Sequence, residues 1–498
     1  MPSATEDATK IVRSPFRQWS VWLPIVLLNL ILLASVLWHD PTASYDSTSH
    51  RRYARILAEG RLATRAETKE FFSPPLAYLP SSAMQAMGIA EMTAEKTWQI
   101  LNVGYSVLVC ILLVKIFLHI CPGRERWAGL PIWLLAMFPV YYRTFSMPRS
   151  EPLVVLFGLA GLYLSLKIAT AKNPGYGKFA LLGVVSGLLI LSRQWGYFLL
   201  PGIYLPLLMR FFVEPDKWAM AKRIATALTL LCLTGGWFYL HLFVNYGSIT
   251  SFNRKKKSFS FSRVYEEVAS VRKFPLVFQD PVRPVFGNAS IPIFYADTWG
   301  DYWAYYLVAG KDTKDGRLTR LSKFNTPEKR NPAGRILTNQ PAMSAYLARV
   351  NLVSLIPTTI LLIALLYALR EMARQIRQRP VPKSIEDIQS GLLLYPVLMA
   401  AVTLLGYGWF QVHYASPKGD TIKASYMIQL FPLLSLIGAW SAMVLYDRKP
   451  QVLRYVLVVM LLVAVHNSGA FMTRLHPSLV DTHKFSPAPA LEVTQDDD

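Results

Sequence analysis

The chain has 498 residues, of which 53% are hydrophobic and 17% charged, against about 25% charged residues in a typical soluble domain. It carries 52 Lys and Arg against 31 Asp and Glu, a formal net charge of +21. This hydrophobic content excludes a disordered chain, and three cysteines exclude a disulfide scaffold. The positive charge would suit a soluble nucleic-acid binder, but the apolar content would not. The class of protein therefore depends on where the charged residues lie relative to the apolar segments.

Apolar runs of about the 20 residues that cross a bilayer recur along the whole chain. They predict an all-α polytopic membrane protein with about eleven transmembrane helices. Prolines interrupt the stretch 127–213, so the number of membrane helices there can differ from this prediction by about one or two. The expected spans are 20–38, 98–120, 127–142, 151–169, 179–192, 195–213, 224–246, 351–369, 389–410, 425–446 and 453–470.

The basic residues of the short loops orient these spans. With the N-terminus in the cytoplasm, most Lys and Arg of the short loops fall inside, which is the positive-inside pattern. Two large loops, 39–97 and 247–350, then lie on the outer face. The resulting division is a cytoplasmic segment 1–19, a membrane core 20–246 that includes the outer loop 39–97, the large outer loop 247–350, membrane helices 351–470 and a flexible outer tail 471–498.

The first outer loop carries the most informative pattern. Residues 47–59 have helical spacing, and Asp46 stands just before them, as an N-cap would. Because Asp46, His50 and Tyr53 are spaced by four and three residues, they can share one side of that helix. Taken alone, this pattern also fits a plain cap on an amphipathic helix at the membrane interface.

The whole loop resembles the first outer loop of the GT-C superfamily of polyprenyl-phosphate-sugar-dependent membrane glycosyltransferases, which includes protein O-mannosyltransferases and the lipid A aminoarabinose transferase. Many bacterial members carry Asp-Glu-x-x-His-x-x-Tyr, then Gly-x-Leu-Pro, then Pro-Pro-Leu-x-Tyr. Ser47 replaces the usual Glu and Ala63 the usual Pro, which weakens the case for a carboxylate pair. The matching positions are Asp46, His50, Tyr53, Gly60, Leu62, Pro74, Pro75, Leu76 and Tyr78.

The resemblance implies an inverting transferase that moves a sugar from undecaprenyl- or dolichyl-phosphate to a glycan, lipid or protein acceptor on the outer face. An acceptor hydroxyl is a poor nucleophile until a carboxylate takes its proton. The phosphate leaving group needs no proton, so one base can suffice, and in-line attack inverts the anomeric carbon. In such enzymes the loop Asp is the proposed base, which implies Asp46 here, with Asp40 as the fallback.

Two further sites lie next to expected spans. Arg149 and Glu151 open the span 151–169, and an ionisable group at membrane depth is a functional candidate. Glu151 is therefore either a second catalytic carboxylate or half of an ion pair with Arg149 that caps the span. Arg193 precedes aromatic residues at the start of 195–213; it either clamps the donor phosphate or reaches the lipid head groups.

The C-terminal half offers weaker candidates for substrate binding. Asp297 and Asp301 lie among six aromatic residues in 295–306, which suits either a sugar or an interfacial aromatic belt. Lys423 and Tyr426 open the span 425–446 and can contact the lipid phosphate or simply anchor the helix. The basic run 254–257 is either a solvated face or a contact for an anionic lipid or phosphorylated acceptor.

The sequence predicts no metal site, because no His or Cys cluster has zinc-ligand spacing. No obligate cofactor is expected, although a divalent cation held by carboxylate and phosphate oxygens stays open. The absence of a P-loop or Rossmann fingerprint favours a lipid-linked over a nucleotide-sugar donor, and the outer location argues against nucleic acid. Two alternatives are a transporter or flippase of lipid-linked sugars and a non-catalytic membrane assembly protein. A bacterial inner membrane is favoured, with the ER membrane as alternative.

Overall fold

The computed structural model describes most of the chain. The N-terminal segment and nearly all of the C-terminal tail predicted above lie outside the described residues, as do Arg254 and Lys255 of the basic run. The described residues are 18–473 without 253–255, 284, 304, 308, 312–317, 321–334, 338–339, 379–380, 417–418 and 420, together with 485–487.

The predicted all-helical membrane fold is confirmed. Within the described residues, eight helical segments are long and apolar enough to cross a membrane. Two shorter apolar helices, α8 (Tyr176–Ser192) and α19 (Pro450–His466), accompany them. The eight segments are α1 (Trp19–Trp38), α4 (Glu91–Ile120), α7 (Glu151–Thr170), η4 with α9 (Gln194–Leu199, Leu200–Val213), α10 to α11 (Lys217–Leu231, Trp237–Tyr246), the end of α14 with α15 (Gln340–Val353, Leu355–Gln378), α17 (Leu394–His413) and α18 (Leu430–Arg448).

The expected span 127–142 has a different structure. It is divided into two short helices, α5 (Leu130–Leu135) and α6 (Pro139–Phe145). Pro139 has no backbone N–H to continue the first helix, and its ring excludes the helical hydrogen bond at that point. The count of eleven spans therefore includes one segment that is not a continuous helix, and the number of crossings stays a prediction.

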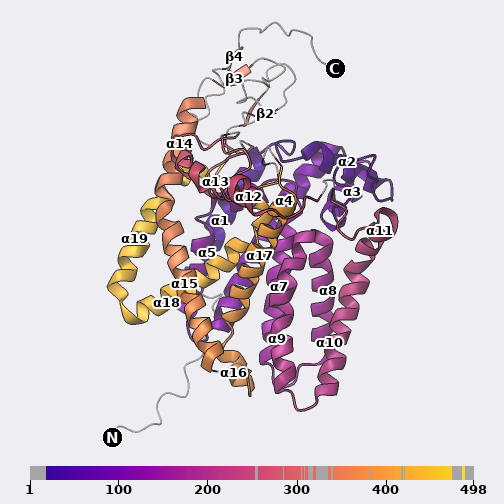
Figure 1. Cartoon of the computed structure of the whole chain (residues 1–498), viewed down its shortest axis with the longest axis vertical. Coiled ribbons are helices and arrows are strands. Elements are labelled where there is room, and N and C mark those ends of the chain that lie inside the picture. Colours follow the sequence, from indigo (N-terminus) through magenta and orange to yellow (C-terminus); the bar gives the residue numbers. More distant parts are fainter. Residues whose placement is uncertain are drawn as a thin grey trace.

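Glycines bring α8 against the segment α10 to α11. A Cβ on Gly183 would collide with the Ala227 carbonyl, and one on Gly187 would collide with Thr234. Gly235, in the π-helical turn η5 (Cys232–Gly236), has the same close approach to Gly187. Small residues allow membrane helices to pack backbone to backbone, and Figure 1 shows α7, α8, α9 and α10 side by side.

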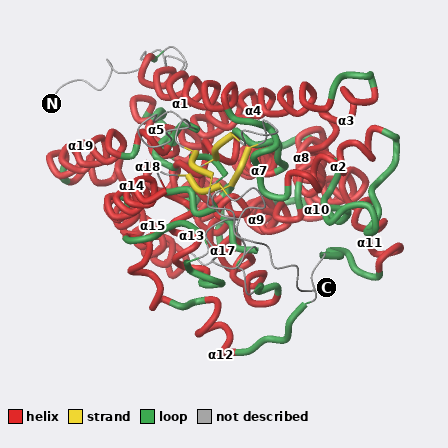
Figure 2. The backbone as a smooth tube through the Cα atoms, turned by 90° about the horizontal axis from the view of Figure 1, so that it is seen from above, coloured by secondary structure: helices red, strands yellow, loops and turns green. Residues whose placement is uncertain are grey.

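Short helices gather at one end of the bundle, which we call the loop end (Figure 1). They are α2 (Ser47–Ala58), η2 (Leu76–Tyr78), α3 (Leu79–Ala86), α12 (Phe261–Arg263) and α13 (Ser290–Trp299). Seen from above in Figure 2, α2 lies close to α8 and α10, and α12 lies at the edge of the bundle. Both outer loops predicted from the sequence thus contribute to the same end.

The other elements are short connections. Strand β1 pairs antiparallel with β2, and β3 pairs antiparallel with β4, so strands form only two three-residue ladders in the described chain. The bounds are η3 (Glu125–Trp127), η6 (Val264–Val268), η7 (Val271–Phe278), β1 (Ala309–Lys311), β2 (Leu318–Arg320), β3 (Arg335–Leu337), α16 (Ile385–Ser390), η9 (Ala424–Met427), η10 (Ser468–Ala470) and β4 (Phe485–Pro487).

Candidate active site

Asp46 lies directly before α2 but does not cap it. Its side chain accepts no hydrogen bond from the helix, and its backbone has a left-handed φ of 51°, which is uncommon for residues other than glycine. Oδ2 instead accepts a hydrogen bond from Lys423 Nζ at 3.0 Å. The Asp46 side chain is 51% exposed, whereas that of Lys423 is 5% exposed. The plain-cap interpretation therefore fails, and the carboxylate is open to a ligand.

Lys423 is held in an aromatic cage before η9. Its ammonium lies 5.0 Å from the centre of the Tyr45 ring, 5.1 Å from that of Tyr426 and 5.7 Å from that of Trp303. The cation on Lys423 keeps the pKa of Asp46 well below its ordinary value. Burial alone would lower the pKa of Lys423, but the Asp46 carboxylate more than offsets this and raises it. The pair is therefore fully ionised at neutral pH.

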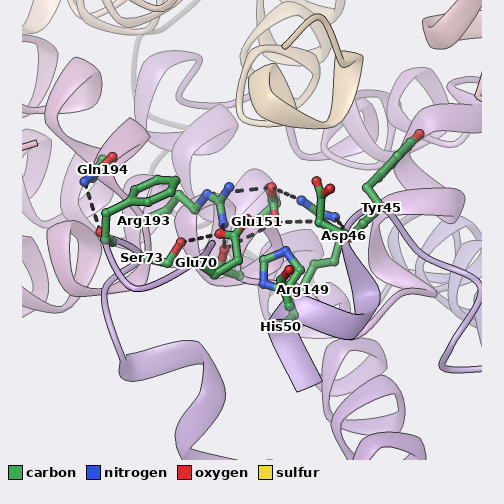
Figure 3. A network of polar contacts seen from close by, with 12 residues as sticks. Tyr45, Asp46, His50, Glu70, Ser73, Arg149, Glu151, Arg193 and Gln194 are labelled. Carbon is green, nitrogen blue, oxygen red and sulfur yellow. Dashed lines mark hydrogen bonds and ion pairs between the residues drawn. The ribbon is translucent and has the colours of Figure 1, made fainter. Parts of the chain in front are cut away.

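Glu151 lies between two buried arginines, as Figure 3 shows. Arg149 forms a forked pair with it, with Nε 3.2 Å from Oε2 and Nη2 3.1 Å from Oε1. On the other side, Arg193 Nε is 3.9 Å from Glu151 Oε1. Arg149 Nη1 also donates to the Tyr45 carbonyl at 2.9 Å. Arg149 therefore connects the first residue of α7 to the segment that carries Asp46.

Glu70 is a third acidic residue of the site, and the sequence analysis missed it. Its Oε2 accepts a hydrogen bond from Ser73 at 2.6 Å and lies 3.8 Å from Arg193 Nη1. Burial alone would raise the pKa of Glu70, but His50 and Arg193 hold it below its ordinary value. Glu70 stands four residues before the Pro-Pro pair, and that position is the one signal that could have drawn attention to it.

His50 and Tyr53 occupy the buried side of α2. His50 Nδ1 lies 2.7 Å from the Tyr78 hydroxyl, and the rings of Tyr53 and Tyr78 are 4.4 Å apart. Burial lowers the pKa of His50 to about 4, so the imidazole is neutral at neutral pH. Both residues thus join α2 to η2, the element that follows the Pro-Pro pair.

Asp297 and Asp301 belong to a neighbouring group that we call the Arg143 cluster. Arg143 Nη2 is 2.8 Å from Asp297 Oδ1, and Arg143 Nη1 is 3.8 Å from Asp301 Oδ1. Asp297 Oδ2 accepts from the backbone N–H of Ala424, and Asp301 Oδ2 from that of Tyr306 at 2.9 Å. All three charged side chains are buried. The carboxylates of Asp297 and Asp301 are therefore engaged by Arg143 and by backbone N–H groups of the chain itself.

Seven of the ten predicted residues form one connected network, in which Lys423 also donates to the Tyr426 hydroxyl and the backbone N–H of His50 donates to the Asp46 carbonyl. The seven are Asp46, His50, Arg149, Glu151, Arg193, Lys423 and Tyr426. Tyr53 lies beside it through Tyr78, and Asp297 reaches it through the Tyr45 hydroxyl, 3.4 Å from Asp297 Oδ1. The fallback base, Asp40, instead accepts from the backbone and hydroxyl of Thr42 in a tight turn. The sequence analysis missed Tyr45, Glu70, Ser73 and Arg143.

Acidic groups of the site are paired with cations of the chain rather than with one another. Asp46 faces Lys423, and Glu151 faces Arg149. Within the described part of the chain, no group of three or more His, Cys, Asp or Glu side chains is placed to hold a metal ion.

Comparisons with known proteins found solved structures of similar fold at 12–14% identity. No family model matches the sequence, and no curated protein matches it. Solved structures do match. ArnT from Cupriavidus metallidurans bound to undecaprenyl phosphate matches over 89% of this chain and 63% of its own, with 12% identity and a TM-score of 0.46. Oligosaccharyltransferase AglB from Archaeoglobus fulgidus, with an inhibitory peptide and a dolichol-phosphate, matches over 92% of this chain and 57% of its own, with 12% identity and a TM-score of 0.44.

A further match is the Pmt1–Pmt2 protein O-mannosyltransferase of S. cerevisiae bound to its sugar donor, at 14% identity and a TM-score of 0.36 over 48% of this chain and 35% of that one. All three are GT-C glycosyltransferases, the superfamily that the first outer loop resembles. The chain spans less than two thirds of the length of these structures. With TM-scores below 0.5, the functional assignment rests on the site itself.

Proposed function

We propose that the chain is an inverting glycosyltransferase that moves a sugar from a polyprenyl-phosphate donor to an acceptor hydroxyl. The observation that carries the proposal is the half-exposed Asp46 carboxylate, held against a buried lysine beside two buried arginines. A base must meet the acceptor, and fixed cations must meet the departing phosphate. These are the two kinds of group that the network presents together.

The Asp46–Lys423 pair couples binding of the donor phosphate to removal of the proton from the acceptor hydroxyl. While Lys423 faces Asp46, the low pKa of the carboxylate makes it a weak base. When a donor phosphate draws the ammonium away, the pKa of Asp46 rises towards its ordinary value and the carboxylate becomes a better proton acceptor. Asp46 then takes the proton of the acceptor hydroxyl as its oxygen bonds to the anomeric carbon. The bond from that carbon to the phosphate oxygen breaks, and its electron pair stays on the phosphate.

The other residues support this reaction in different ways. Arg193, whose guanidinium lies 5.6 Å from the centre of the Tyr426 ring, is the second contact for the phosphate. Glu151 fixes Arg149 and Arg193 by its charge, and His50 and Tyr53 hold α2 in place. Asp297 binds the backbone next to Lys423 through Ala424, so in this scheme it and Asp301 position the lysine rather than contact the sugar.

The location of the network favours an enzyme over a transporter. Asp46, Lys423 and Arg193 each stand directly before a helix, and Glu151 is the first residue of one. A transport pathway would place ionisable groups near the membrane midplane. A site at the helix ends instead meets an acceptor in water and a donor in the bilayer. A scaffold protein would need no half-exposed carboxylate opposite a buried lysine.

The chain is a multi-pass integral membrane protein. We propose that its loop end faces outwards, as the positive-inside pattern indicates. The sugar would then come from undecaprenyl-phosphate at a bacterial inner membrane or from dolichyl-phosphate at the ER. The acceptor is a glycan, lipid or protein, and the scheme needs no cofactor, metal or nucleic acid.

Mass spectrometry of glycans and lipid-linked sugars in a deletion strain tests this function. The strain would be complemented with the wild-type chain, with Asp46→Asn, or with Asp40→Asn as the matched control. We expect the wild type and Asp40→Asn to restore a glycan that the deletion lacks, while Asp46→Asn leaves the unused lipid-linked donor to accumulate. Glycans and lipid-linked sugars that do not change on deletion would contradict the proposal.

A further inference from the structure

An apolar groove lies between α15, α18 and α19, far along the bundle from the candidate active site. Its volume is about 430 Å³, and its walls include Leu134, Ala364, Ala442, Val456 and Met460. Figure 1 shows α19 at the edge of the bundle beside α15. A space with such a lining does not retain water well and suits a hydrocarbon chain.

One end of this groove is charged. Arg448 is the one charged residue that lines it within the described chain, and its guanidinium lies 5.9 Å from the centre of the Tyr367 ring. Arg448 is the last residue of α18, the helix that begins close to Lys423. The charged end is therefore opposite the loop end, on the side that the positive-inside pattern assigns to the cytoplasm.

Further cations continue from Arg448 along the surface. The Arg126 guanidinium lies 4.9 Å from the centre of the Tyr446 ring, and Arg124 Nη2 lies 2.7 Å from Asp447 Oδ2. Tyr446 and Asp447 belong to the last turn of α18. Lys449 follows Arg448 directly and is exposed. We call Arg124, Arg126, Arg448 and Lys449 the basic rim. Two carboxylates, Glu125 and Asp447, accompany these four cations, so the rim keeps a net positive charge.

We infer that the groove and the basic rim bind an anionic glycerophospholipid, with an acyl chain between α15, α18 and α19 and the phosphate at Arg448. Charge complementarity identifies the occupant, because anionic lipids are attracted to clustered Lys and Arg at a membrane surface. A polyprenyl-phosphate donor does not fit the proposed reaction here, since its phosphate would lie at the end of the bundle opposite Asp46. The exclusion of that donor rests on the proposed function, whereas the groove and the basic rim are observed independently of it.

The binding is tested by native mass spectrometry of the purified full chain. Phosphatidylglycerol, phosphatidylcholine and sugar-free undecaprenyl phosphate are added separately, and the retained lipid is counted. We expect phosphatidylglycerol to be retained best. The double variant Arg126→Gln/Arg448→Gln should weaken that retention about fivefold for each cation removed. Lys222→Gln is the matched control, because Lys222 is also an exposed cation over an aromatic ring, 5.3 Å from the centre of Trp218 on α10, away from the groove.

A second variant tests the groove itself. Ala442→Phe places a ring in the space between the helices, so it should reduce the retention of phosphatidylglycerol without any change of charge. Thermal unfolding in the absence of lipid checks that each variant is folded. Equal retention of phosphatidylglycerol and phosphatidylcholine, or retention that neither variant changes, would overturn the inference. Preferential retention of undecaprenyl phosphate that depends on Arg448 would overturn it in favour of a carrier-lipid site.

Discussion

Two groups of opposite charges lie side by side at the loop end, and they differ in exposure. In the Arg143 cluster, the carboxylates of Asp297 and Asp301 are buried and accept hydrogen bonds from backbone N–H groups. In the other group, Asp46 accepts a hydrogen bond from the charged side chain of Lys423, and half of its side chain is exposed. An aspartate paired with a basic residue is thus buried in the Arg143 cluster but half-exposed in the Asp46–Lys423 pair.

The pKa values follow this difference. Burial raises the pKa of Asp297, although Arg143 beside it acts in the opposite direction. The pKa of Asp46 is lowered instead, because Lys423 outweighs the loss of solvent. A half-exposed carboxylate whose pKa is set mainly by one lysine can respond to a ligand that binds that lysine, whereas a carboxylate fixed by backbone hydrogen bonds cannot. This contrast separates the residues that we expect to affect catalysis from those that we expect to affect folding.

The largest effect on stability is expected from Arg143→Ala. This variant leaves two buried carboxylates without their cation, which typically costs about 3–5 kcal/mol. Thermal unfolding in detergent would measure it. Arg61→Ala is the control, because Arg61 pairs with Glu59 and Glu67 on the surface and surface pairs contribute little. Equal stability of the two variants would mean that the Arg143 cluster is not the structural unit described above.

Lys423→Met should change the pH dependence of transfer. Lys423 holds the pKa of Asp46 down, so without it Asp46 becomes protonated at a higher pH. We expect the acid limb of the kcat/KM profile, which reports the free enzyme, to move up by about 1–3 pH units and the KM for the donor to rise. Lys256→Met is the control, since Lys256 is another lysine beside an aromatic ring, 5.6 Å from the centre of Trp409. An unmoved acid limb would show that Lys423 does not control the base.

A smaller effect is expected at His50. Its pKa in the folded chain is about 4, against an ordinary value of 6.5. The unfolded chain therefore takes up a proton first as the pH falls, so stability is lost between about pH 6.5 and 4, by at most about 3 kcal/mol. His50→Gln should flatten the slope of unfolding free energy in that window. A slope that is the same in wild type and variant would contradict the assignment of a neutral, buried imidazole.

Much of the membrane architecture could be predicted from the sequence, because apolar length is a local property. The expected span 20–38 is α1 (Trp19–Trp38), and the helical pattern 47–59 is α2 (Ser47–Ala58). The expected span 127–142 lies in the stretch that prolines interrupt, and the structure shows that Pro139 starts a new helix within it. Local hydropathy does not contain that hydrogen-bond constraint.

The partners within the site could not be predicted. Asp46 and Lys423 are separated by 377 positions, and the sequence contains nothing that links them. Glu70 lacks a recognisable motif, and its role becomes visible only when Arg193 and Ser73 are placed beside it. Asp297 and Asp301 were predicted to bind substrate from their aromatic neighbours, and burial within the Arg143 cluster is what suggests a positioning role instead.

The central claim is that Asp46 is the general base, and the most direct test is turnover by the purified Asp46→Asn variant. The rate of sugar transfer from a polyprenyl-phosphate donor would be measured alongside donor binding and thermal stability. Loss of a general base typically costs about 10²–10⁴-fold in rate. We predict a loss of that size with donor binding and thermal stability retained. An Asp46→Asn variant that transfers sugar at the wild-type rate would contradict the account.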